Sequence, residues 1–228
     1  MVGQAASYLA ALLLLAYIIT TAIGLSNLPT SDDPIQDPYF SVMEVLIICL
    51  MPLVLVAFAV LFIVLIHNKK VQQNEAIESS HQAFFLLCSI LSYSMLVMAS
   101  AITSCVHAAV LVANRSSLKD LMMADSEETK QLYEYLFAFE WPSVVYALDI
   151  LAWDWFFALA LLLAALVLPP WRTKPPHGDQ EAAKRYHQRA LQVLLFASGA
   201  LSLLGLEAIP LNNINVRAIG IVGYAVLT

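Results

Sequence analysis

Charged side chains are scarce in this sequence. They make up 12% of its 228 residues, about half of the roughly 25% that is usual for a soluble domain, and residues 1–31 contain none. The charges that are present are mainly acidic, so the formal net charge is −6. A protein that binds the phosphates of a nucleic acid needs a basic face. The sequence therefore predicts no nucleic-acid partner.

Cysteine is also rare. The three cysteines, Cys49, Cys88 and Cys105, all lie within apolar runs. They form no CxxC pair, and no His or Cys accompanies them at the spacing of a metal site. We expect them to pack as small apolar side chains, and we expect no metal ligands in this chain.

Hydrophobic residues, by contrast, make up 61% of the chain, against roughly 45 to 50% in a soluble domain. About 20 apolar residues suffice to cross the hydrocarbon core of a bilayer. Such windows lie at residues 8–25, 45–66, 84–112, 144–168 and 190–206, and a further one begins at Ala218. The sequence thus predicts an all-α fold, a polytopic transmembrane helix bundle of about six to seven spans. We expect residues 1–228 to form a single domain whose last helix is incomplete.

The distribution of Lys and Arg predicts how these spans are oriented. Seven of the eleven basic residues follow the second and fourth windows, and the positive-inside rule places those loops and the N-terminus in the cytoplasm. The ionisable residues of the spans then gather in the opposite half of the membrane. They are Glu44, His107, Glu140, Asp149, Asp154 and Glu207, with Arg217 just beyond. We interpret this as a polar pocket on the lumenal or outer side, although polar helix ends alone would place several of them there.

Glu140, Asp149 and Asp154 fall in the stretch that leads into the fourth window. An ionisable group at bilayer depth costs on the order of 3 kcal/mol and normally faces a partner or a polar cavity. Asp154 lies about 18 Å along a helix that starts near Pro142, too deep to be a helix-end residue. The alternative is that Glu140 lies at the headgroup level and the two aspartates only pair structurally with other helices.

Other polar and aromatic residues accompany these carboxyls. A polar stripe runs along residues 82–114 at helical spacing and contains Tyr93, Ser100, Thr103 and His107; such stripes usually join helices by packing and hydrogen bonds. The aromatic residues Trp141, Tyr146 and Trp153 lie beside the carboxyls. Their rings suit an apolar ligand or a developing cation, and they equally suit an interfacial aromatic belt. Residues 119–135 are expected to form a short surface helix.

The apolar surroundings of the carboxyl groups determine which reactions they suit. Hydrocarbon around a carboxyl favours its protonated form, which can donate a proton, and a second carboxylate can accept one. Together with aromatic walls, these groups suit the protonation and opening of an epoxide in a hydrophobic substrate. They also suit a proton-coupled transporter.

Two segments of the chain resemble a known family. They are Asp37-Pro38-Tyr39-Phe40 up to Met43-Glu44, and Glu140-Trp141-Pro142-Ser143 up to Asp149 and Trp153-Asp154. Both are similar to small integral-membrane terpene cyclases of the ascochlorin and ascofuranone type and to the related epoxide hydrolases of fungal polyene-pyrone pathways. The resemblance covers nearly the whole chain. It implies epoxide opening on a prenylated or polyketide substrate, with no metal or organic cofactor. We expect a multi-pass integral membrane protein, located in the endoplasmic reticulum if the organism is a eukaryote.

The leading hypothesis is a membrane enzyme in which Asp149 or Asp154 protonates an epoxide. Glu44 or Glu140 would be its carboxylate partner. His107 would relay protons or serve only as a hydrogen-bonded structural residue. Cyclisation and hydrolysis both remain open at this point.

Two further residues are expected near the site, and a second function is possible. Glu207 and Arg217 would lie behind the site, and the partners would be a hydrophobic small molecule and membrane lipid. The rival is a small proton-coupled carrier or a non-catalytic membrane subunit. Carriers often contain internal repeats, and the sequence shows none.

Overall fold

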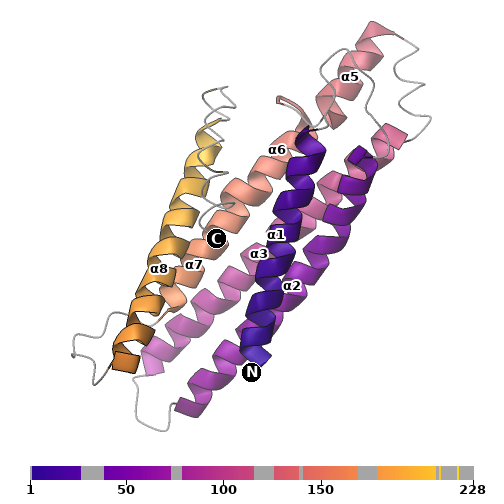
Figure 1. Cartoon of the computed structure of the whole chain (residues 1–228). Helices are drawn as coiled ribbons and strands as arrows, with labels where there is room; N and C mark the ends of the chain where they lie inside the picture. The colour runs from indigo at the N-terminus through magenta and orange to yellow at the C-terminus, as the bar shows by residue number, and fades with distance from the viewer. Residues whose placement is uncertain are drawn as a thin grey trace. The chain divides into compact units, whose positions relative to one another are not determined.

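The computed structural model describes residues 2–26, 39–72, 79–115, 126–138, 141–168, 179–208, 211 and 220. Every element within these ranges is a helix (Figure 1), which confirms the all-α class for this part of the chain. In order they are α1 (Val2–Ser26), α2 (Tyr39–Gln72), α3 (Ser79–Arg115), α5 (Glu127–Phe137), α6 (Val144–Ile150), the π-helix η1 (Leu151–Phe157), α7 (Ala158–Val167), α8 (Asp179–Gly205) and the 3₁₀-helix η2 (Leu206–Ala208).

Three helical stretches are long and apolar enough to cross a membrane. They are Ser41–Val64 in α2, Ala83–Ala113 in α3, and Val144–Val167, which runs through α6, η1 and α7. They match the windows predicted at 45–66, 84–112 and 144–168. A shorter apolar stretch, Tyr8–Thr20, lies in α1. The described chain is consistent with a membrane protein, and the total of six to seven spans stays a prediction.

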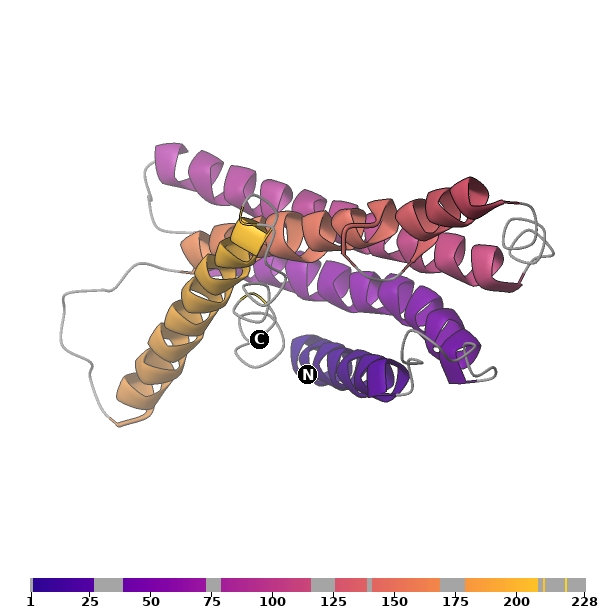
Figure 2. The same cartoon turned by 90° about the horizontal axis from the view of Figure 1, so that it is seen from above.

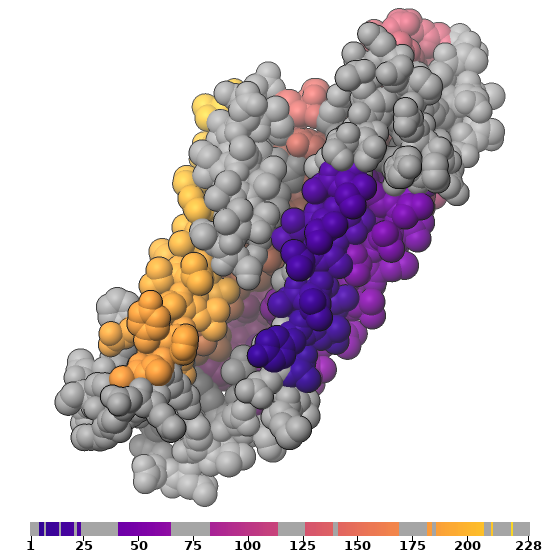
Figure 3. All heavy atoms as spheres, viewed as in Figure 1, coloured from indigo at the N-terminus to yellow at the C-terminus, as the bar shows by residue number. Residues whose placement is uncertain are grey.

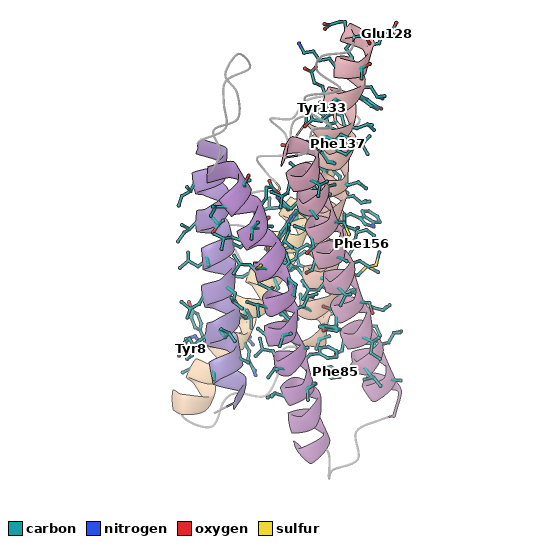
Figure 4. The ribbon with its side chains drawn as sticks, turned by 90° about the vertical axis from the view of Figure 1, so that its right-hand side faces the viewer. Tyr8, Phe85, Glu128, Tyr133, Phe137 and Phe156 are labelled. Atoms are coloured by element: carbon teal, nitrogen blue, oxygen red, sulfur yellow. The ribbon has the colours of Figure 1, made fainter. Side chains whose placement is uncertain are left out.

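The outward faces of these helices are apolar. Large hydrophobic side chains are half exposed or more along them, among them Leu53, Val56, Ile63, Phe84, Leu87 and Val112. Tyr8, which projects from α1 in Figure 4, is 72% exposed, and the outer surface of α1 is in view in Figure 3. A soluble monomer rarely exposes so much contiguous apolar surface. Lipid hydrocarbon would cover it.

The chain divides into two compact units, each built from separate pieces of sequence. The first comprises Met1–Val64 and Ala99–Ala152, and the second comprises Leu65–Met98 and Trp153–Thr228. In the first unit α1 runs beside the initial part of α2 (Figures 1 and 4).

Helical spacing explains the core of the first unit. On α1 the buried residues Ala6, Ala10 and Tyr17 share one face. On α2 the buried residues Ile47 and Met51 are four positions apart, which again puts them on one face. Each helix thus turns an apolar face inward as well as outward, and the few buried polar groups stand out against this background.

In the second unit α7 packs against α8 (Figures 1 and 2). A Cβ added at Gly199 would lie 2.7 Å from Leu162 Cγ and 2.8 Å from the carbonyl oxygen of Ala158. Ser198 and Ser202 are buried on the same helix. Small residues at such a face let two helix backbones approach closely.

Side-chain hydrogen bonds to backbone carbonyls also join the helices of the second unit. Ser92 Oγ donates to the carbonyl of Ala160 at 2.7 Å. Gln192 Nε2 donates to the carbonyl of Ala165 at 3.0 Å. In an apolar surrounding a polar side chain that finds a carbonyl avoids the cost of burial without a partner.

Helix α5 confirms from residue 127 onward the short surface helix expected over residues 119–135. Residues 119–125 lie outside the described residues. Ser126 caps the N-terminus of α5 by accepting a hydrogen bond from the backbone N–H of Thr129 at 3.2 Å. Tyr133 is buried and its ring lies 5.7 Å from that of Phe137 (Figure 4). Burial raises the pKa of the Tyr133 phenol.

Candidate active site

Glu44 and His107 meet inside the first unit. Glu44 lies in the first turns of α2 and His107 near the end of α3. His107 Nδ1 is 2.6 Å from Glu44 Oε2, a short hydrogen bond that is an ion pair when the imidazole carries a second proton. Glu44 is 0% exposed and His107 is 2% exposed, so water does not weaken this contact.

Asp149 joins the pair from a third helix. It lies in α6, is 5% exposed, and its carboxyl is near enough to act electrostatically on that of Glu44. The start of α6 is fixed by Ser143, which accepts a hydrogen bond from the N–H of Tyr146 at 3.2 Å. The hydroxyl of Ser143 in turn donates to the carbonyl of Ala138.

Glu44, His107 and Asp149 therefore form one buried site, which we call the acid–base site. Two carboxyls near each other cannot both ionise cheaply, and an imidazole beside them favours the charged form of its neighbour. The arrangement can hold a proton, release it and take it back.

Asp154 has different surroundings, within the second unit. It lies in η1, the π-helix, and is fully buried. A Cβ at Gly205 would lie 2.9 Å from Asp154 Cγ, and one at Gly220 would lie 2.6 Å from Asp154 Oδ1. Only residues without a side chain let the backbone come this close, so the two glycines form a cradle for the Asp154 carboxyl.

The sequence alone does not indicate this cradle. An isolated glycine inside an apolar run is a signal of close backbone approach, and Gly205 and Gly220 both carry it, but nothing in the sequence points from them to Asp154. The sequence also does not indicate the π-helix η1. Because a π-helix bonds i to i+5 instead of i+4, positions beyond Ile150 do not follow a 100° α-helical wheel.

The aromatic residues differ in burial. Trp153 is buried, with its ring 5.1 Å from that of Phe157 one turn later in the same helix. Trp141 and Tyr146 are half-buried. The latter two are thus the better placed for contact with a ligand or with lipid.

The remaining predicted site residues lie elsewhere or are not described. Glu207 is exposed in η2. Glu140 and Arg217 lie outside the described residues. Within the ranges that the structure describes, no three His, Cys, Asp or Glu side chains converge as metal ligands.

Comparison of the chain with models of known families, with curated proteins and with solved structures finds no match. Over the described residues the chain is all-helical, and three helices there are long and apolar enough to cross a membrane. It carries a buried Glu–His pair accompanied by an aspartate.

A double-mutant cycle tests the Glu44–His107 contact. Glu44→Met alone or His107→Leu alone leaves a buried polar partner behind and is expected to lower the free energy of unfolding by about 3 kcal/mol. The double variant removes both groups and should cost much less than the sum. Reversible unfolding in detergent measures this, with Ser94→Ala, an exposed change on α3, as control. Additive losses would contradict the contact.

The glycine cradle predicts a suppressor. Gly220→Ala brings a methyl group against Asp154 Oδ1 and should destabilise the protein by roughly 1 to 3 kcal/mol. Asp154→Ala removes the obstructing carboxyl, so the double variant should regain most of that loss. Gly199→Ala is the matched control, because its methyl group meets Leu162 and Ala158 instead and Asp154→Ala should not rescue it. Equal rescue of both alanine variants, or of neither, would exclude the cradle.

Proposed function

We propose that this chain is a membrane-embedded enzyme that opens an epoxide in a hydrophobic prenylated or polyketide substrate by carboxylic-acid catalysis. The observation that carries the proposal is the 2.6 Å contact between Glu44 and His107, fully buried, with the Asp149 carboxyl in electrostatic reach. Ionisable groups inside membrane spans are costly and usually functional. Neighbouring carboxyls with different partners suit separate roles as acid and base.

In this proposal Asp149 is the acid and Glu44 the base. Asp149 donates a proton to the epoxide oxygen while the adjacent C–O bond breaks and its electron pair goes to that oxygen. A nucleophile forms the new bond to carbon, and the proton it releases goes to Glu44. His107 holds the Glu44 carboxylate through Oε2 and links the two proton positions.

The sequence leaves open whether Asp149 or Asp154 is the acid, and we do not assign that role to Asp154. The backbone of Gly205 and Gly220 lies against its carboxyl, which leaves little room for a substrate beside it. We assign Asp154 to positioning of the helix that carries it, and Asp149 to the chemistry.

A hydrophobic substrate fits the setting of the acid–base site. The site lies within helices whose outer faces are apolar, so a lipid-soluble molecule could approach from the bilayer. Trp141 and Tyr146 lie just before and within the first turn of α6, the helix that carries Asp149, and are half-buried. Their rings would stabilise positive charge that develops on carbon as the epoxide opens. The family resemblance supports the same chemistry, with cyclisation or hydrolysis as the outcome and no metal or organic cofactor.

We also propose how the chain crosses the membrane. We place six to seven spans in the membrane, with the N-terminus in the cytoplasm and the acid–base site in the lumenal or outer half. In a eukaryote this membrane would be the endoplasmic reticulum. The excess of Lys and Arg after the second and fourth windows supports the orientation.

A proton-coupled carrier is the second candidate. Chains of Asp, Glu and His in spans also serve as proton relays in transporters, and the Glu44–His107 contact with Asp149 would suit that role. A carrier would move protons without changing its substrate, whereas a non-catalytic subunit would do neither.

Turnover of model epoxides tests the proposal. Membranes that contain the full chain should convert an epoxyfarnesyl phenol or an epoxidised polyene to a cyclic product or a diol. Asp149→Asn should lower the rate at least about 100-fold, because it removes a general acid. Glu134→Gln, which changes an exposed carboxyl of α5, is the control and should leave the rate unchanged.

Two results would contradict this reading. Full activity in Asp149→Asn would remove Asp149 from the chemistry. No product from either epoxide, together with proton uptake into vesicles that depends on Asp149, would favour the carrier.

A further inference from the structure

Two residues of the first unit each contain a fully buried oxygen atom that has no hydrogen-bond partner among the described residues. The atoms are Glu44 Oε1, which is the oxygen that does not face His107, and Thr103 Oγ1. Both residues are 0% exposed. Asp149 Oδ1 is another such atom of the first unit, although the Asp149 carboxyl acts electrostatically on that of Glu44. Leaving a buried polar atom unsatisfied costs about 1 to 3 kcal/mol, so folded proteins contain few of them and each one calls for an explanation.

Glu44 and Thr103 are both neighbours of His107. Thr103 and His107 are four residues apart on α3, which places them on one face of the helix, about 5 to 6 Å apart between Cβ atoms. His107 is hydrogen-bonded to the carboxyl whose second oxygen is Glu44 Oε1. Thr103 therefore lies one helical turn from the residue that binds the Glu44 carboxyl.

Thr103 does not do what hydroxyls in apolar helices commonly do. Ser and Thr there usually donate to the carbonyl four residues earlier, as Ser94 does on the same helix, to Ile90 at 2.9 Å. Thr103 makes no such bond. Its hydroxyl is available to a group other than its own backbone.

We propose that Glu44 Oε1 and Thr103 Oγ1 together bind a hydroxyl group, either water or a hydroxyl of the substrate. This inference deepens the proposed function and rests on it. An ionised carboxylate only accepts hydrogen bonds, while a threonine hydroxyl can donate one. A ligand hydroxyl satisfies both by donating to Glu44 and accepting from Thr103. A carbonyl or an ether oxygen would offer no hydrogen to Glu44.

This hydroxyl subsite supplies the nucleophile of the reaction. The bound oxygen attacks the epoxide carbon and forms the new C–O bond, while its proton passes to Glu44 Oε1. The C–O bond of the epoxide breaks toward the epoxide oxygen, which takes the proton of Asp149. Water then gives a diol, and a substrate hydroxyl gives a cyclic ether. Thr103 is a positioning residue, because it orients the nucleophile and takes no proton in the sum.

Binding of unreactive probes tests the subsite apart from catalysis. The probes are a farnesyl phenol that has no epoxide and its methyl ether, each titrated into the full chain in lipid nanodiscs. A hydrogen bond to a carboxylate predicts that the phenol binds about tenfold more tightly. Thr103→Val should lower the affinity for both probes about tenfold, because each accepts a hydrogen bond from Thr103, whereas Thr103→Ser should keep that affinity. Ser94→Ala, which changes a hydroxyl on the same helix, should keep it.

Water labelled with the heavy oxygen isotope distinguishes the two sources of the hydroxyl. A labelled diol whose formation falls about tenfold in Thr103→Val, without a phenol preference in binding, identifies water as the bound group. An unlabelled cyclic ether with a phenol preference identifies the substrate hydroxyl.

Failure of the subsite and failure of the proposed function give different results. Equal binding of both probes, with the same turnover in wild type and Thr103→Val, would overturn the subsite and leave the enzyme. A phenol preference together with phenol binding that weakens in Thr103→Val, without turnover of any epoxide, would overturn the enzyme and support the subsite.

Discussion

The hydrogen bond between Glu44 and His107 is the contact on which the first unit and its proposed chemistry depend. It joins α2 to α3 in a surrounding where neither side chain reaches water. In such a medium a buried charge without a partner is far more costly than a paired one. The pair therefore joins α2 to α3 at this point, and the carboxyl of Asp149 on α6 acts electrostatically on that of Glu44. Removing one group of the acid–base site would leave the others buried without a partner, which would lower the free energy of unfolding.

Asp149 and Asp154 show two ways of housing a carboxyl in an apolar protein. Asp149 shares its surroundings with other proton-binding side chains. Asp154 instead lies against the backbone of Gly205 and Gly220, where any added side chain would collide with it. The two residues are close in sequence, yet the change from α6 to η1 lies between them. Their different neighbours are the reason for assigning one to proton transfer and the other to positioning.

The sequence predicted the parts of the fold that depend on local composition. The three spans that the structure contains begin and end within a few residues of windows read from hydropathy alone, because transfer of a helix into hydrocarbon depends mainly on its own side chains. The gathering of Glu44, His107 and Asp149 was also foreseeable. Consecutive transmembrane helices alternate in direction, so the start of the window at 45–66, the end of the window at 84–112 and the start of the window at 144–168 are expected at the same membrane face.

What could not be predicted depends on neighbours in space. Nothing local to Gly205 or Gly220 indicates a carboxyl beside it, and nothing in residues 151–157 announces a π-helix. Thr103 was read as part of a polar stripe that packs between helices. Its importance appears only when the structure shows that it does not bond to its own helix, as Ser94 does.

The most direct test of the account is nitrogen NMR of His107 in the full chain in lipid. The chain has five histidines, and the resonance missing from His107→Asn identifies the one of interest. We expect the Nδ1 proton of His107 to be strongly hydrogen-bonded in the wild type and its resonance to shift markedly in Glu44→Gln, which keeps the shape of the side chain but not its charge. A His107 resonance that is the same in both proteins would contradict the buried Glu44–His107 pair, and with it the acid–base site.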